Sequence, residues 1–150
     1  MIQEFCIRKM KKKDVPQVCL IERQIFSIPW SEQSFITSME QEHTLYLVAE
    51  EANTKQLAGY CGLYQSLDEA YITNVAVKPE YRRQHVAEQM LIQLLDSAKG
   101  CGVERFTLEV RVSNLAAVAL YTGLGFERAG IRRRFYERPV EDAVIMWKYR

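Results

Sequence analysis

Apolar and polar positions in the first third of the chain follow helical spacing after one short strand-like run. The run FCIRK (residues 5–9) predicts a strand. Asp14 is placed to cap a helix whose first turn accommodates Pro16, and the expected buried stripe of that helix is Val15, Val18, Leu20, Ile21 and Ile25. A second helix is predicted to begin at Ser31.

The middle of the chain has the periodicity of strands. Three strand-like runs occupy residues 44–51, 56–66 and 70–78, and the segments EANTK and SLDE between them have the composition of turns. Because these connections are short, the sequence predicts an antiparallel meander.

Beyond Pro79, helical and strand-like segments alternate. The spacing of apolar residues predicts a helix from about Arg82 to Lys99, with a buried stripe of Val86, Met90, Leu91 and Leu94. A strand over residues 105–110 and a helix over residues 114–124 are then expected. Two paired strands should follow, one from residue 126 onward and one over residues 142–149. The chain is therefore expected to form one α/β domain over residues 1–150, with a mixed sheet flanked by helices.

Composition supports one globular domain and excludes a strong overall charge. Hydrophobic residues make up 48% of the 150 positions, which is enough for a sizeable core. The 20 basic and 19 acidic side chains nearly cancel, so no global field draws the protein to nucleic acid or to a membrane.

The cysteine and histidine content argues against metal and disulfide sites. The cysteines have no C-x-x-C pair and few histidines accompany them, the full set being Cys6, Cys19, Cys61, Cys101, His43 and His85. We therefore expect reduced thiols and no bound metal. The N-terminal segment breaks into charge too early for a signal peptide or a membrane helix, so a cytoplasmic location is expected.

The stretch RRQHVAEQML (residues 82–91) is the first candidate for binding chemistry. In an open α/β sheet, ligands gather at the carboxyl ends of strands, where a helix N-terminus presents free N–H groups. Arg82 and Arg83 at this helix start favour a phosphate ligand. The alternative stays open, because a surface helix with incidental arginines would have the same sequence.

A second constellation lies in LEVRVSNLAAVALYTGLGF (residues 108–126). Asn114 is placed to cap a helix, and Tyr121 lies seven residues on, so both can face one cleft. By strand alternation, Glu109 points away from the core face. Two interpretations are compatible with this pattern. In one, Tyr121 is a core aromatic and Glu109 a solvated side chain; in the other, both line a cavity, as acid and base.

The order of these motifs resembles the GNAT superfamily of N-acetyltransferases, in which an NVAV-type strand, a basic loop and SNxxAxxLYxxxGF follow one another. The segments PWSEQSF, DEAYITNVAV and EDAVIMW extend the similarity, over almost the whole chain, to the bacterial ribosomal-protein N-terminal alanine acetyltransferases. The resemblance implies a GNAT-like fold, with a mostly antiparallel sheet splayed around an acetyl-CoA cleft. It also implies acetylation of the N-terminal alanine of a small-subunit ribosomal protein, without a metal.

Carried over by position, the resemblance implies roles for individual residues. Glu109 would be the general base and Tyr121 the general acid. Backbone groups of Val75, Ala76 and Val77 would hold the pantetheine arm of acetyl-CoA, and Asn114 would hydrogen-bond the cofactor. The pyrophosphate would lie against the loop residues Arg82, Arg83, Gln84, His85, Val86, Ala87 and Glu88. The acceptor peptide would be contacted by Trp30 and Tyr136.

The loop departs from the family pattern Q/RxxGxG/A, because His85 stands in a glycine position and Ala87 in the last. Glycine is required there only if the residue has a positive φ or if a Cβ would strike the phosphates; right-handed helical residues would bind equally well. We expect Ala87 to be an allowed variant and Glu88 to point outward. We expect His85 to be tolerated, with pyrophosphate binding weakened or re-routed.

Several functional alternatives follow from the sequence. The acceptor could be another protein N-terminus or a small amine, which would change the acceptor groove and not the catalytic residues. A non-catalytic acyl-CoA-binding module is favoured by the missing glycines and disfavoured by Glu109, Asn114 and Tyr121 together. Direct nucleic-acid binding is disfavoured by the net charge, although Arg132, Arg133 and Arg134 form a basic run that could touch ribosomal RNA. The oligomeric state is not readable from the sequence.

Overall fold

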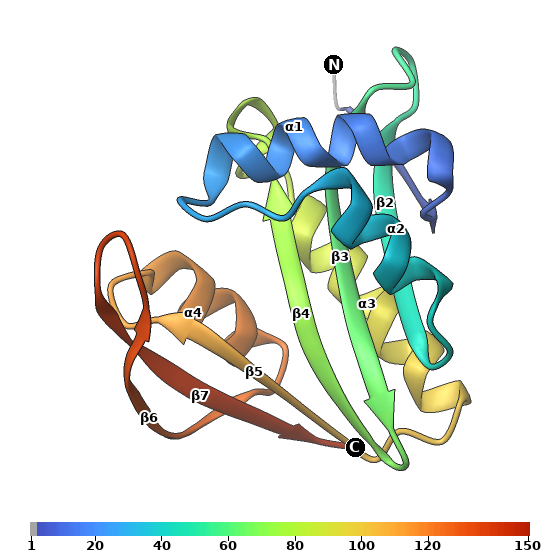
Figure 1. Ribbon diagram of the computed structural model, residues 1–150. Coiled ribbons are helices and arrows are strands. Elements are labelled where there is room, and N and C mark those ends of the chain that lie inside the picture. The colour runs from blue at the N-terminus through green and yellow to red at the C-terminus, as the bar shows by residue number, and fades with distance from the viewer. Residues whose placement is uncertain (1–2) are drawn as a thin grey trace.

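The structure is a computed structural model that describes residues 3–150, and it is built around a seven-stranded sheet (Figure 1). In chain order, the elements are β1 (Phe5–Lys9), η1 (Lys12–Asp14), α1 (Val15–Ile25), α2 (Glu32–Glu40), β2 (Thr44–Glu51), β3 (Leu57–Ser66), β4 (Glu69–Val77), η2 (Pro79–Tyr81), α3 (Val86–Gly100), β5 (Arg105–Arg111), α4 (Leu115–Gly123), β6 (Glu127–Tyr136) and β7 (Glu141–Tyr149). The predicted mixed α/β fold is confirmed.

The sheet has the strand order β1-β2-β3-β4-β5-β7-β6. Neighbouring strands are antiparallel except for β4 and β5, which are parallel. Strands β2, β3 and β4 form the predicted meander, and β6 pairs with β7 as predicted.

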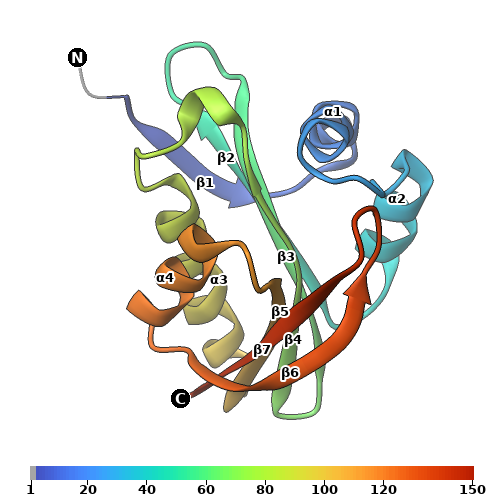
Figure 2. The ribbon, with the colours of Figure 1, turned by 90° about the vertical axis from the view of Figure 1, so that its left-hand side faces the viewer.

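Helices cover both faces of the sheet (Figure 2). On one face, α1 and α2 bury a cluster that includes Val18, Ile21 and Phe35. On the other face, α3 and α4 bury a larger cluster, in which the predicted stripe of α3 is fully enclosed. The sheet thus separates two apolar layers, and the buried residues of β2, β3 and β4 are divided between them.

The parallel pair β4 and β5 separates soon after it begins. Only Glu69, Ala70 and Tyr71 of β4 pair with β5, opposite residues 105–107. Both strands continue beyond these pairs and diverge, as Figure 1 shows. The carboxyl-terminal half of β4 therefore has β3 on one side and an opening on the other, so the expected splayed sheet is present.

A β-bulge lies in β4 beside this opening. Gly62 of β3 pairs with Asn74 and Leu63 pairs with Ile72, which leaves Thr73 as the extra residue. A bulge changes which face of a sheet the following side chains occupy. Accordingly, Ile72 belongs to the cluster under α3, whereas Ala76 belongs to the cluster under α1 and α2.

Two details of α1 differ from the prediction. Leu20 is 58% exposed, and Glu22 occupies the buried face in its place because its carboxylate has partners there. Asp14 immediately precedes the helix, as expected, but its side chain does not cap it. The carboxylate instead accepts hydrogen bonds from Arg8 and from the backbone N–H of Lys11.

The start of α3 also differs from the prediction. The helix begins at Val86 and not at Arg82, because Arg83 and His85 have φ values of 64° and 60°. Left-handed residues interrupt the helical hydrogen-bond pattern. The segment before Val86 is therefore a loop. By contrast, α2 begins as predicted, since the Ser31 side chain accepts a hydrogen bond from the N–H of Ser34.

Candidate active site

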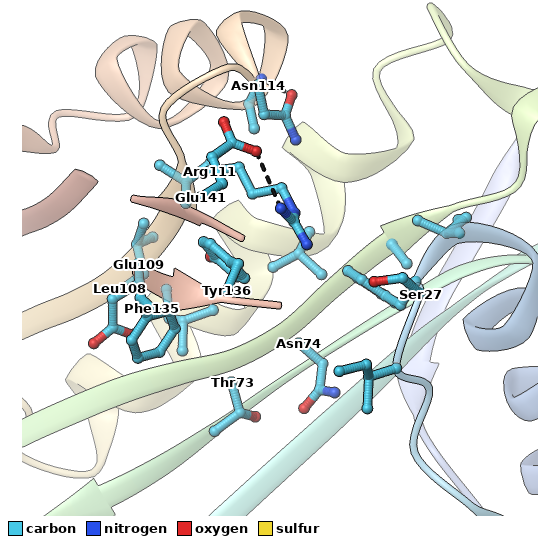
Figure 3. A pocket seen from close by; sticks show the side chains of 18 of the residues that line it. Ser27, Thr73, Asn74, Leu108, Glu109, Arg111, Asn114, Phe135, Tyr136 and Glu141 are labelled. Atoms are coloured by element: carbon cyan, nitrogen blue, oxygen red, sulfur yellow. Dashed lines mark hydrogen bonds and ion pairs between the residues drawn. The ribbon is translucent and has the colours of Figure 1, made fainter. Parts of the chain in front are cut away.

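An open cavity of about 980 Å³ lies where β4 and β5 separate (Figure 3). Residues of α1 and of the loop that follows it line one end, and residues of α3 and α4 line the other. These helices lie on opposite faces of the sheet, so the cavity passes through the sheet. Its volume is within the range of about 300–1,000 Å³ that is typical of small-molecule and cofactor sites.

Glu109 on β5 lies in this cavity and not in bulk solvent. Its side chain is 7% exposed. One carboxylate oxygen accepts a hydrogen bond from the Tyr71 hydroxyl, and the other lies 3.1 Å from Nε of Arg132 on β6. The sequence allowed Glu109 to be either a solvated side chain or a cavity residue, and the structure shows that it lines a cavity.

Tyr71 was not singled out from the sequence, although it lies within the DEAYITNVAV segment. It occupies the last position of β4 that still pairs with β5, which directs its hydroxyl to Glu109 two residues further along β5. Burial, and then the Glu109 carboxylate, raise the pKa of Tyr71, so its hydroxyl remains a hydrogen-bond donor at neutral pH. Strand alternation in the sequence could have shown that Tyr71 faces away from the core. Its contact with Glu109, however, depends on the parallel register of β4 and β5, which the sequence does not reveal.

Asn114 and Tyr121 line the same cavity, as their spacing predicts. Asn114 caps α4 by accepting a hydrogen bond of 3.1 Å from the N–H of Ala117. Tyr121 is only 7% exposed and packs against Phe126, with 5.8 Å between the ring centroids. Burial raises the pKa of Tyr121, which keeps the phenol protonated. Tyr121 is therefore both a core aromatic and a cavity residue.

Val75, Ala76 and Val77 also line the cavity. The N–H of Lys78 donates to the carbonyl of Ala58 on β3. Since successive N–H groups of a strand point to opposite sides, those of Val77 and Val75 point away from β3 and into the opening. Within residues 3–150, no strand pairs with this edge of β4, so its backbone donors and acceptors are open to a ligand.

The loop before α3 contributes less to the cavity than expected. Of the seven predicted phosphate-loop residues, only Ala87 is among the lining residues. Val86 is buried in the core, and Gln84 donates to the carbonyl of Glu80. Within residues 3–150, neither Arg82 nor Arg83 takes part in an ion pair, so both guanidinium groups are available to an anion.

His85 has the left-handed conformation that its glycine position suggests. The helix predicted from about Arg82 is therefore wrong at His85, whereas Ala87 lies inside α3 and is right-handed. The imidazole Nδ1 lies 3.0 Å from the Glu88 carboxylate, and the two side chains are 79% and 45% exposed. Both side chains are therefore directed outward, as expected for Glu88.

The α1 end of the cavity contains Trp30 and a buried carboxylate, Glu22. Glu22 accepts hydrogen bonds from the backbone N–H of Trp30, at 3.0 Å, and from the Tyr60 hydroxyl. Burial raises the pKa of Glu22, and these two donors oppose that effect. Glu22 thus ties the loop after α1 to β3.

Tyr136 lines the cavity from the hairpin between β6 and β7. The Arg111 guanidinium lies 4.5 Å from the centre of its ring and donates to Glu141, as the dashed line in Figure 3 shows. Arg111 also donates to the carbonyls of Glu137 and Pro139. One arginine therefore holds the whole turn at the cavity mouth. Burial, and then Glu109, raise the pKa of Tyr136 to about 12.

Within residues 3–150, no helix is long and apolar enough to cross a membrane. In the same part of the chain, no group of three or more histidine, cysteine, aspartate or glutamate side chains is arranged to hold a metal ion.

The sequence pattern of the Acetyltransferase (GNAT) family matches residues 15–126. The chain belongs to the GNAT acetyltransferase family. A Bacillus subtilis (strain 168) protein named "Putative [ribosomal protein bS18]-alanine N-acetyltransferase" is 41% identical over 142 residues, which cover 94% of this chain and 93% of that protein. The "[Ribosomal protein bS18]-alanine N-acetyltransferase" of Escherichia coli (strain K12) is 37% identical over 93% of this chain and 94% of its own.

A solved structure supports the same assignment. The crystal structure of the ribosomal-protein-S18-alanine N-acetyltransferase from Escherichia coli superposes with a TM-score of 0.88 at 37% identity, over 97% of this chain and 94% of that one. The resemblance found in the sequence motifs is thereby confirmed, and the protein is an acetyltransferase with the GNAT fold.

Proposed function

We propose that this acetyltransferase transfers the acetyl group of acetyl-CoA to the N-terminal α-amine of a protein. The acceptor we propose is the N-terminal alanine of a small-subunit ribosomal protein, which the names of the relatives support. The observation that carries the proposal is the Glu109 carboxylate, held by Tyr71 at the opening of the sheet. An amine acceptor needs a base at the place where the two substrates meet.

The residues on the α3 side of the cavity fit acetyl-CoA. The free edge of β4 at Val75 and Val77 offers backbone groups that can pair with the amide groups of a pantetheine arm, as a neighbouring strand would. The N-terminus of α3 presents free N–H groups, which together with Arg82 and Arg83 suit a pyrophosphate. Asn114 caps α4 through its oxygen, which leaves its amide N–H₂ for the cofactor.

In the proposed reaction, acetyl-CoA supplies an activated acyl group as a thioester. An N-terminal amine has a pKa of about 7.7–8.0, so much of it is protonated at neutral pH and cannot attack. Glu109 accepts that proton, directly or through a water molecule. Backbone N–H groups of β4 stabilise the negative charge on the acetyl oxygen during attack. Tyr121, kept protonated by its burial, donates a proton to the departing sulfur.

The placement of these groups bears on the alternatives. Glu109 and Tyr121 line one cavity, which a non-catalytic acyl-CoA-binding module would not require. Another protein N-terminus or a small amine would use the same catalytic groups. Such an acceptor would differ only in its contacts at the α1 end of the cavity. We expect residues 1–150 to act as one domain. Because the proposed acceptor is a ribosomal protein, we expect the enzyme to act in the cytoplasm.

The test is turnover of acetyl-CoA with a short alanine-starting peptide from a small-subunit ribosomal protein. We expect stoichiometric release of free thiol and addition of one acetyl group to the α-amine, located by mass spectrometry. The matched control is the same peptide with a blocked N-terminus, which should not react. Acetyl-CoA binding without thiol release would contradict the proposal, and acetylation of lysine side chains would contradict the acceptor assignment.

A further inference from the structure

Two oxygen atoms in the cavity wall have no hydrogen-bond partner within residues 3–150, namely Thr73 Oγ1 and Asn74 Oδ1. Both residues belong to the bulge of β4, and Asn74 is only 6% exposed. Figure 3 shows their side chains projecting from the same side of β4. Buried polar atoms in folded proteins are nearly always paired, so an unpaired set that lines a cavity indicates the place of a ligand.

The face of the sheet indicates which substrate they meet. Asn74 alternates with Val75 and shares its face with Ala76, which packs in the cluster under α1 and α2. Val75 and Val77 pack on the opposite face, toward the helix that begins with the phosphate loop. The Asn74 side chain is therefore directed away from the side proposed for acetyl-CoA.

The base lies on the same side of the sheet as Asn74. On β5, Leu108 and Val110 belong to the cluster under α3 and α4, so Glu109 between them points to the other face. Thr73, Asn74 and Glu109 line the same cavity, so a ligand on this face of the sheet can contact all three.

The chemistry of the atoms restricts the ligand. The amide oxygen of asparagine is only an acceptor, and the threonine hydroxyl oxygen has acceptor capacity as well. The ligand must bring N–H donors on one small head group, and a primary ammonium carries three. One of them can be directed to Glu109 and the other two to the β4 bulge.

We propose that Thr73 and Asn74 bind the α-amine of the acceptor and hold it beside Glu109. The inference rests on the proposed function and adds to it the residues that recognise a free, primary amine. It also assigns a purpose to the bulge, which places two successive polar side chains on the acceptor side of the opening.

The test compares the near-isosteric variants Asn74→Leu and Thr73→Val with wild type in steady-state kinetics, using acetyl-CoA and an alanine-starting peptide. We expect Asn74→Leu to raise the KM for the peptide by about 10- to 100-fold, the range of a hydrogen bond to a charged group. The KM for acetyl-CoA and its calorimetric Kd should stay within about twofold, because the cofactor side is unchanged. Asn53→Leu, at an exposed position outside the cavity, is the matched control.

Two further measurements separate recognition from structure. Since Asn74 Oδ1 has no protein partner, Asn74→Leu should melt at the same temperature as wild type or higher. Binding of the Nα-acetylated peptide, which has a single N–H at that nitrogen, should weaken less than binding of the free-amine peptide.

The outcomes distinguish this inference from the proposed function. A raised KM for acetyl-CoA with an unchanged KM for the peptide would assign the two oxygens to the pantetheine arm and overturn the inference. A lowered melting temperature with equal losses for both peptides would overturn it as well. Wild-type turnover with an unaffected Asn74→Leu variant would overturn only the inference, whereas no wild-type turnover would overturn the proposed function and the inference with it.

Discussion

Arg132 reaches across β7 to place its Nε 3.1 Å from the Glu109 carboxylate on β5. This contact and the Tyr71 hydroxyl hold both oxygens of Glu109 in the cavity. Because Arg132 comes from an exposed edge strand, we propose that it positions the carboxylate and does not itself react. Catalysis depends on such orientation, because a small displacement of a base lowers the rate of proton transfer.

Removing the arginine tests this role. We expect Arg132→Met to lower kcat about tenfold while the KM for acetyl-CoA is unchanged, because the carboxylate loses one of its two anchors. The matched control is Arg133→Met on the same exposed strand, which should behave as wild type. Equal kinetics for the two variants would show that the ion pair is incidental.

Replacing Glu109, the proposed base, should have a larger effect. Glu109→Gln keeps the shape of the side chain and removes its proton affinity, and we expect kcat to fall about 10²- to 10⁴-fold at pH 7. The defect should shrink toward pH 9, because an amine with a pKa of about 7.7–8.0 then loses its proton to solvent. A defect that is independent of pH would argue that Glu109 does not take up the proton of the amine.

Tyr121→Phe tests the proposed acid. We expect kcat to fall about 10²-fold with little change in either KM, because the hydroxyl acts only on the departing sulfur. Burial raises the pKa of Tyr121, so its proton is retained through the alkaline range. The activity of the wild type should therefore not fall between pH 8 and 10 through ionisation of Tyr121. A fall in this range that is present in the wild type and absent in Tyr121→Phe would contradict the assignment.

The Asp14 carboxylate should control acid stability. Burial alone would raise its pKa, but hydrogen bonds from Arg8 and the Lys11 N–H outweigh that effect and lower it. The unfolded chain then binds the proton more readily, so this stabilisation is present above the unfolded pKa of about 3.9 and is lost as pH falls through the lower folded value.

Accordingly, Asp14→Asn should lower the free energy of unfolding by about 2 kcal/mol at pH 7, the range of hydrogen bonds to charged groups. The difference from wild type should narrow below pH 4, as measured by urea denaturation. The control is Glu40→Gln, whose ion pair with Lys12 is exposed and should contribute less than about 1 kcal/mol. A constant difference across the pH range would contradict the linkage.

His85→Gly tests the glycine position of the loop. A left-handed φ costs a residue with a Cβ about 1–2 kcal/mol, and glycine costs about 0.5–1 kcal/mol in backbone entropy. We therefore expect a gain of about 0.5–1 kcal/mol in stability, by the difference of these terms. Since the imidazole faces Glu88 and solvent, calorimetry should show no loss of acetyl-CoA affinity.

Arg83→Gly is the informative comparison, because Arg83 has a similar φ of 64°. It should gain similar stability but lose affinity for acetyl-CoA, since it removes a guanidinium from the proposed phosphate site. A tenfold loss of affinity in His85→Gly would instead show that the histidine is a ligand.

The sequence by itself determined the elements and the family of this protein. Periodicity predicts the α3 stripe, the meander and the pairing of the last two strands, because these depend on local patterns of apolar residues and short connections. The Asn114 cap and the position of Tyr121 seven residues later are also local properties of one helix. The SNxxAxxLYxxxGF segment carries the family resemblance for the same reason.

Only the tertiary structure decided which side chains meet across the cavity and which polar atoms there stay unpaired. Tyr71, Arg132 and Glu109 come from three strands, and no local pattern brings them together. The unpaired oxygens of Thr73 and Asn74 exist because β4 bulges beside a neighbour that has already diverged. Register and splay are set by packing of the whole sheet between its two helical layers, and a residue's partners across that sheet are therefore a property of the folded chain.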